Sequence, residues 1–160
     1  MTQPDSLSDI YLRHFQSIRE RTYDFLAVLT TADLALKLPF PEAQSLLDQL
    51  WCVVGAHESY LRELQCGAWQ GFSCSLERLD EYTPATIRHQ MQQSDQAMRG
   101  LLGEIDLAAP LANGKYGYEV VQTMIEHETH HHGQFINLIY CHHLPIPESW
   151  HLKWNLSRDE

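Results

Sequence analysis

The sequence has few basic residues, and this excludes several kinds of partner. Of its 160 residues, 11 are lysine or arginine and 21 are aspartate or glutamate, which gives a formal net charge of −10. A protein that binds nucleic acid or an anionic membrane surface needs a basic face to neutralise phosphate groups. The composition therefore argues against both kinds of partner.

Other features of membrane, secreted and zinc-finger proteins are also missing. No apolar run approaches the roughly 18 residues of a transmembrane helix, and the opening stretch MTQPDSLSDI has neither a basic nor an apolar segment of signal-peptide type. The four cysteines form no C-x-x-C pair, so they do not predict a structural zinc site. We expect a cytoplasmic protein in which Cys52, Cys66, Cys74 and Cys141 are buried, reduced thiols.

What the sequence does contain is helical periodicity. Apolar residues recur at spacings of three and four in four segments, over residues 5–30, 41–66, 83–105 and 118–143. Strand-like alternation, low-complexity segments and internal repeats are not found. Four amphipathic helices of this length predict one all-α domain over residues 1–160, built as a four-helix bundle.

The most distinctive stretch is HETHHHGQ, residues 127–134. Its first five residues, from His127 to His131, read H-E-x-x-H, which is the zinc-peptidase signature when it lies on a helix. This short pattern has many false positives, and a peptidase also needs Glu128 directed at a metal-bound water, a further ligand and a strand that holds the substrate. Because no such strand is visible, a zinc peptidase is the less favoured alternative.

Three histidines have the positions of metal ligands. His127 and His131 lie one turn apart on the apolar stripe of the last helix, so both are predicted to face the core. His57 lies on the corresponding stripe of the second helix. Three imidazoles on two inward faces can converge on one divalent metal, and three protein ligands with open positions are typical of a catalytic site. For His57 taken alone, the alternative is a hydrogen-bonded core histidine.

The other histidines near the end of the chain are expected to have lesser roles. His130 lies about 100° from the apolar stripe and His132 about 200° from it. We therefore expect His130 to support a ligand and His132 to lie at the surface. His142, His143 and His151 lie near the helix end, where cationic side chains suit the helix dipole.

This pattern resembles the DinB-like superfamily of four-helix metalloproteins, also called DinB/YfiT-like. The resemblance rests on the run YEVVQTMIEHETHHHGQFINLIY, the tail HLPIPESW and the histidine in GAHESYLREL. Family members show H-x-x-H-H-x-G-Q late in the chain, which here extends from His127 to Gln134. Many members place the second-helix histidine about one turn earlier, where this chain has Cys52-Val53. His57 fits the members with a later histidine.

The resemblance implies an up-down-down-up bundle that holds a divalent metal through His57, His127 and His131. We expect zinc or nickel. It also implies thiol S-transfer, thiol-dependent isomerisation or hydrolysis, in which a metal makes a nucleophile of a water or a low-molecular-weight thiol near neutral pH.

Three further residues are candidates to orient a ligand or assist the reaction: Glu128, His130 and Glu58. Two other classes compete with the enzyme. One is a metal-binding, stress-associated protein without catalysis, and the other is a structural bundle without metal.

Aromatic residues in the expected loops and tail predict self-association, because exposed aromatic clusters mark interfaces. They are Trp69, Phe72, Trp150 and Trp154. A homodimer that acts on a small molecule is the expected assembly.

Overall fold

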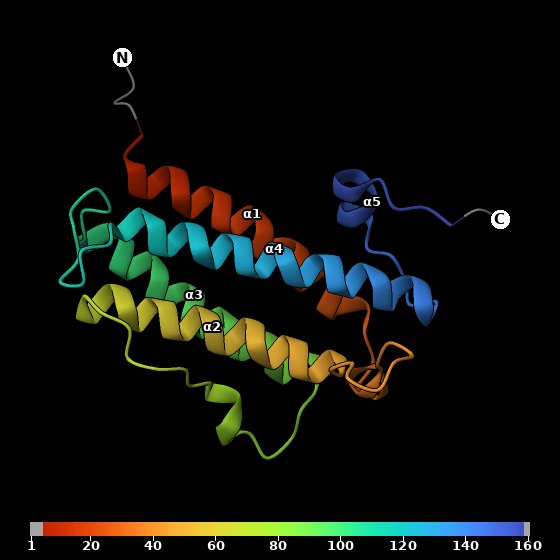
Figure 1. Cartoon of the computed structure of the whole chain (residues 1–160). Coiled ribbons are helices and arrows are strands. Elements are labelled where there is room, and N and C mark those ends of the chain that lie inside the picture. The colour runs from red at the N-terminus through yellow and green to blue at the C-terminus, as the bar shows by residue number, and fades with distance from the viewer. Residues whose placement is uncertain (1–4, 159–160) are drawn as a thin grey trace.

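The computed structural model describes residues 5–158, and its regular elements are helices (Figure 1). The four long helices are α1 (Leu7–Val28), α2 (Leu46–Cys66), α3 (Pro84–Glu104) and α4 (Gly117–Cys141). Three short elements complete the chain: the 3-10 helices η1 (Ala32–Ala35) and η2 (Ser75–Arg78), and the α-helix α5 (Glu148–Trp154). The predicted all-α class is confirmed. Among residues 5–158, no helix has the length and apolar character needed to span a membrane.

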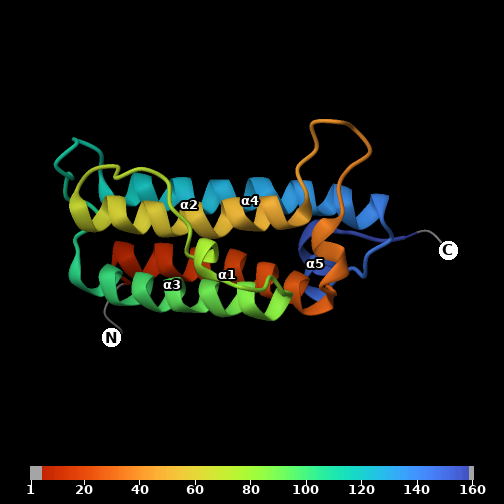
Figure 2. The ribbon, with the colours of Figure 1, turned by 90° about the horizontal axis from the view of Figure 1, so that it is seen from below.

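The long helices pack around a common interior. α1 contacts α3 and α4, and α2 contacts the same two helices, so α1 and α2 lie diagonally across the bundle. The connection over residues 67–83 runs back along the bundle, so that α3 runs in the same direction as α2 (Figure 2). α1 and α4 run in the opposite direction.

The caps explain where α2 begins and ends. The Ser45 hydroxyl accepts a hydrogen bond from the Asp48 N–H, and the Asp48 carboxylate accepts one from the Ser45 N–H at 2.9 Å. This reciprocal pair forms a capping box, so α2 begins at Leu46 and not near Pro41 as the spacing predicted. Gly67 ends the helix with φ 75°, in the left-handed region that favours glycine.

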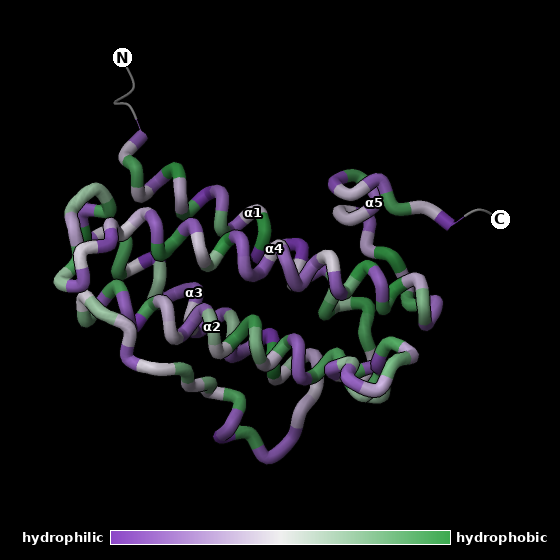
Figure 3. Tube along the Cα trace, in the orientation of Figure 1, coloured by the Kyte–Doolittle hydropathy of each residue, from purple (hydrophilic) through white to green (hydrophobic). Residues whose placement is uncertain are grey.

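The core has two apolar parts with a polar layer between them along the helices. One part contains Phe25, Phe135 and Trp150, and the other contains Phe15 and Met124. Figure 3 shows hydrophobic and hydrophilic residues interspersed along each long helix. On every long helix, buried polar residues lie in sequence between the two apolar sets: Arg19, Thr22, His57, Ser94, Asp95, Glu128, His131 and His132.

The short helix α5 was not predicted, and it buries a residue expected to be exposed. Trp150 packs against Phe25 with ring centroids 5.3 Å apart, and its Nε1 donates to the Arg21 carbonyl oxygen at 2.8 Å. The expectation that Trp150 marks an interface was wrong, because α5 folds back onto α1. Trp69 and Phe72 are exposed, at 47% and 51%.

The cysteines are reduced, but most of them are not buried. All four are free within the described range. Cys74 is buried and Cys52 is half-buried, whereas Cys66 and Cys141 are exposed. The expectation of burial was wrong for Cys66 and Cys141, because each lies at the solvent side of the last turn of a helix.

Candidate metal centre

Cys52 of α2 converges with His127 and His131 of α4. One ligand atom from each of the three lies within 4.8 Å of the others. The Cys52 Sγ is 3.4 Å from the His127 Nε2, and the two imidazole centroids are 4.7 Å apart. The helical spacing of four residues places the two imidazoles together, and the packing of α2 against α4 adds the thiol. We call these three residues the trio.

Burial sets the protonation of the trio. It is the main cause that lowers the pKa of His131 to about 4, followed by the neighbouring His127 and His130. Burial, then His130, also lowers the pKa of His127, and burial raises the pKa of the Cys52 thiol. Near neutral pH the trio therefore contains two neutral imidazoles and one protonated thiol.

This donor set fits a divalent metal. Neutral imidazole nitrogens and a cysteine sulfur, which coordinates as thiolate, are the ligands that zinc prefers in proteins. The His131 Nδ1 is buried and has no hydrogen-bond partner among residues 5–158. A buried nitrogen without a partner is the kind of polar atom that a bound ion would satisfy.

His57 does not join the trio. It lies five residues after Cys52, which turns its side chain about 140° around α2. Its Nδ1 is 3.1 Å from the Ser94 Oγ, and its Nε2 is 3.4 Å from the Met98 Sδ, both on α3. The ring stacks on Phe15 of α1, with centroids 4.8 Å apart. The predicted convergence of three imidazoles is therefore corrected to two imidazoles and a thiol.

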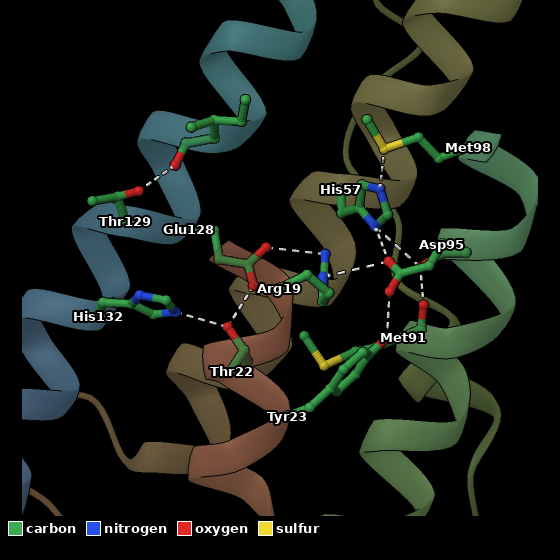
Figure 4. A network of polar contacts seen from close by, with 12 residues as sticks. Arg19, Thr22, Tyr23, His57, Met91, Asp95, Met98, Glu128, Thr129 and His132 are labelled. Atoms are coloured by element: carbon green, nitrogen blue, oxygen red, sulfur yellow. Dashed lines mark hydrogen bonds and ion pairs between the residues drawn. The ribbon is translucent and has the colours of Figure 1, made fainter. Parts of the chain in front are cut away.

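A second polar group, centred on Arg19, occupies the middle of the bundle (Figure 4). Arg19 is 1% exposed, and its Nη2 is 3.1 Å from Glu128 Oε2 while its Nε is 3.4 Å from Asp95 Oδ1. Thr22 donates to Glu128 Oε1 at 2.5 Å, and the Tyr23 hydroxyl donates to Asp95 Oδ2. One guanidinium cation thus lies between two carboxyl groups, whose pKa values are raised first by burial and lowered in part by Arg19.

Glu128 therefore does not have the position that a peptidase requires. One of its carboxylate oxygens accepts from Thr22 and the other pairs with Arg19, and both partners are on α1. The trio lies at the contact of α4 with α2. The H-E-x-x-H pattern in this chain lacks the geometry in which the glutamate faces a metal-bound water.

His132 is buried, although the sequence predicted that it would lie at the surface. It is 0% exposed, and its Nε2 is 2.8 Å from the Thr22 Oγ1. Because Thr22 gives its single hydroxyl proton to Glu128, His132 must donate its Nε2–H to Thr22. Burial is the main cause that lowers the pKa of His132 to about 3. The prediction was wrong because α5 covers this face of α4, with Trp150 4.8 Å from the His132 ring centroid.

The remaining candidates separate into one beside the trio and one away from it. His130 is exposed, its ring centroid is 5.6 Å from that of His131, and its Nε2 is 2.9 Å from the Gln134 Nε2. Glu58 instead accepts hydrogen bonds from the Ser75 N–H at 2.8 Å and the Ser75 hydroxyl at 2.5 Å. Glu58 therefore binds the first residue of η2, while His130 lies at the edge of the trio.

Comparisons with known proteins agree with this architecture. The sequence model of the DinB family matches residues 1–140. A crystal structure of a DinB-like protein from Bacillus cereus superposes with a TM-score of 0.68 at 23% identity, and the alignment covers 86% of this chain and 93% of that chain. At this level of identity the likeness concerns the fold alone. No curated protein sequence matches the chain.

Proposed function

Because the chain belongs to the DinB family, we propose that it is a metal-dependent enzyme whose divalent metal is held by Cys52, His127 and His131. The observation that carries the proposal is the approach of a thiol and two imidazoles to within 4.8 Å of one another on facing helices. Zinc fits this donor set best and nickel is the second choice. The helix directions also support the up-down-down-up topology that the family resemblance implies.

The trio would provide three donors and leave positions open for a substrate. A divalent metal held there acts as a Lewis acid that lowers the pKa of a coordinated water or thiol. His127 and His131 are already neutral, and Cys52 loses its proton on coordination. His130, exposed beside His131, is placed to accept the proton of the nucleophile. We propose S-transfer from a low-molecular-weight thiol, or hydrolysis, as the reaction class.

The other two candidates have structural roles in this proposal. Glu128 holds α4 against α1 through Arg19 and Thr22, which fixes the direction of the adjacent His127. Glu58 fixes the long connection after α2 through Ser75. Neither carboxylate is assigned a part in the reaction.

Metal content tests the ligand set. Protein purified without a histidine tag is analysed for metals, and is then loaded with cobalt to detect the near-ultraviolet thiolate-to-cobalt absorption. Alanine variants of Cys52, His127 and His131 should each lose most of the metal, and Cys52→Ser should lose the thiolate band. His57→Gln, a matched change on the same helix as Cys52, should keep both. Loss of metal in His57→Gln, with retention in Cys52→Ala, would overturn the assignment.

Turnover separates the enzyme from a metal-binding protein without catalysis. The metal-loaded protein is assayed with small thiols and aliphatic or epoxide electrophiles, and His130→Ala is compared with His89→Ala at an exposed position of α3. A metal-dependent rate that falls in His130→Ala alone supports the enzyme. Stoichiometric metal without any turnover favours the stress-associated, non-catalytic alternative.

We also propose that the chain forms a homodimer. The support is the exposure of Trp69 and Phe72, both of which are in the connection after α2. Exposed aromatic side chains are enriched at protein interfaces. Sedimentation of the wild type and of a Trp69→Ser, Phe72→Ser variant tests this, and a monomeric wild type at high concentration would contradict it.

A further inference from the structure

A pocket of about 390 Å³ lies between the residues that precede α2 and the second half of α4. Gln49 is three residues before Cys52 on α2, and Gln134 is three residues after His131 on α4. Both glutamines line the pocket, and three residues correspond to about 4.5 Å along a helix. Gln134 also contacts His130, with 2.9 Å between the Nε2 atoms. None of the trio lines the pocket, which lies about one helical turn from Cys52 along α2 and from His131 along α4.

The charged side chain in the lining of the pocket, Glu42, disfavours negative charge. Four carboxamides and one carboxylate line it, those of Gln44, Gln49, Gln134, Asn137 and Glu42. Within the described part of the chain, no lysine, arginine or histidine is in the lining. An anionic group that entered would lie near a carboxylate, without a cationic side chain in the lining, in a molecule of net charge −10.

The same groups favour a ligand that donates hydrogen bonds. Gln49 is 4% exposed, and the Oε1 atoms of Gln49 and Gln134 accept no hydrogen bond from any residue in the range 5–158. A buried acceptor without a donor is costly, by about 1–3 kcal/mol in typical proteins. Leu38, Phe40 and Ala43 form an apolar part of the wall, which suits a short aliphatic segment.

We infer that this pocket binds the tail of a small thiol whose far end carries hydroxyl, amide or amine groups and no negative charge. The inference rests on the proposed function, because the sulfur of the thiol would lie at the trio while the tail lies against Gln49 and Gln134. The trio determines the chemistry, and the pocket selects the substrate.

Thiol–disulfide exchange tests the pocket on the full-length protein without metal. The Cys52 thiolate attacks one sulfur of an added disulfide RS–SR, the S–S bond breaks, a Cys52–S–S–R bond forms and RS⁻ leaves. In a buffer of RSH and RSSR, the fraction of Cys52 that carries the mixed disulfide at equilibrium reports how well the tail R fits the pocket. The probes are bis(2-hydroxyethyl) disulfide, cystamine and 3,3′-dithiodipropionate. Cys66, exposed and about 21 Å further along α2, is the internal reference in peptide mass spectrometry.

The expected result is a preference at Cys52 that Cys66 does not show. When the occupancy of Cys52 is normalised to that of Cys66, the mixed disulfides with hydroxyethyl and aminoethyl tails should be about tenfold more favoured than the one with a carboxyethyl tail. This ratio corresponds to about 1.4 kcal/mol. The double variant Gln49→Leu, Gln134→Leu should lose this preference, while Gln93→Leu on α3 should keep it. Glu42→Lys, a change at an exposed position, should shift the preference toward the carboxyethyl tail.

Three results would overturn the inference. They are an equal or greater occupancy by the carboxyethyl tail at Cys52, an unchanged preference in both the glutamine double variant and Glu42→Lys, and no exchange at Cys52 while Cys66 reacts. Since metal is absent from this experiment, a failure of tail selection is distinct from a failure of metal binding in the proposed function.

Discussion

Arg19 of α1 and Glu128 of α4 form an ion pair in which both side chains are buried, with 3.1 Å between Nη2 and Oε2. Glu128 is adjacent in sequence to His127 and three residues before His131. The contact that holds α4 against α1 therefore also determines how the two imidazoles face α2. The interior charges and the trio are thus mechanically connected through one turn of α4.

Replacing Arg19 by methionine should destabilise the protein strongly. The change leaves Glu128 and Asp95 buried without a cation, and breaking one partner of a buried pair typically costs about 3–5 kcal/mol. Urea unfolding measures the loss. The triple variant Arg19→Met, Glu128→Gln, Asp95→Asn should recover much of it. Arg13→Met, at an exposed ion pair with Asp5, is the control and should change stability by less than about 1 kcal/mol.

Stability should fall in mild acid in part because of His57. Burial, and then the charge of Arg19, hold the pKa of His57 well below 6.5 in the folded protein. In the unfolded chain the residue takes up a proton below about pH 6.5, so the unfolded state binds more protons. The stabilisation is complete above that pH and is lost as pH falls, by up to about 1.4 kcal/mol per unit.

The variant His57→Gln isolates this contribution. Its free energy of unfolding, measured in urea between about pH 7.5 and 5, should depend less steeply on pH than that of the wild type. His14→Gln, at an exposed position of α1, serves as the control. Equal slopes in the wild type and His57→Gln would show that His57 takes up its proton in the folded state.

Metal binding near pH 7 should release one proton per ion. The pKa of Cys52 is raised by burial and those of His127 and His131 are lowered, so the thiol alone must lose a proton to coordinate. Zinc titration calorimetry in buffers of different ionisation enthalpy counts the protons. Cys52→His should bind zinc with little proton release, because a neutral imidazole replaces the thiol. Proton release that persists in Cys52→His would place its source outside the trio.

Gly133→Ala should stabilise the protein by roughly 0.5–1 kcal/mol. Gly133 lies inside α4, and a Cβ added there meets no heavy atom within 4 Å in the described structure. Gly117→Ala on the same helix should have the opposite effect, because its Cβ would come within 3.1 Å of the Leu107 backbone. Thermal unfolding compares the two variants, and a destabilised Gly133→Ala would indicate that α4 departs from the described packing.

The helices could be predicted because their signal is local. Apolar residues three and four apart define each long helix, and the predicted ends agree with the structure to within a few residues at α1, α3 and α4. The start of α2 was misplaced because apolar spacing does not mark a helix end, which here is set by the capping pair of Ser45 and Asp48. α5 has seven residues, too few for a periodic pattern to be distinguished from a loop.

The two imidazoles could be predicted because they share a helix, but the third member of the trio could not. Its choice depends on how α2 is rotated against α4, which only tertiary packing decides. α2 contacts both α3 and α4, so its apolar stripe is wide and includes two different inward faces. Cys52 lies on the face toward α4 and His57 on the face toward α3. The departure of Cys52 from the family pattern was the one signal in the sequence.

The Arg19 network was missed for the same reason. A basic residue between Ile18 and Thr22 on an apolar stripe indicates a buried cation, but its partners come from two other helices. Asp95 and Glu128 each lie on an apolar stripe of their own helix. To predict that both carboxylates pair with Arg19, one must know how the helices are ordered around the bundle.

The burial of Trp150 also affects the order in which the protein can fold during synthesis. The apolar set that contains Phe15 is complete once residue 125 has been made, whereas the set that contains Phe25 requires Trp150 and Leu156. Phe25 and Phe135 therefore remain uncovered until Trp150 and Leu156 have packed, whereas the set that contains Phe15 needs no residue beyond 125. Until then this end of the bundle is an exposed apolar surface, of the kind that makes partly folded chains prone to aggregate.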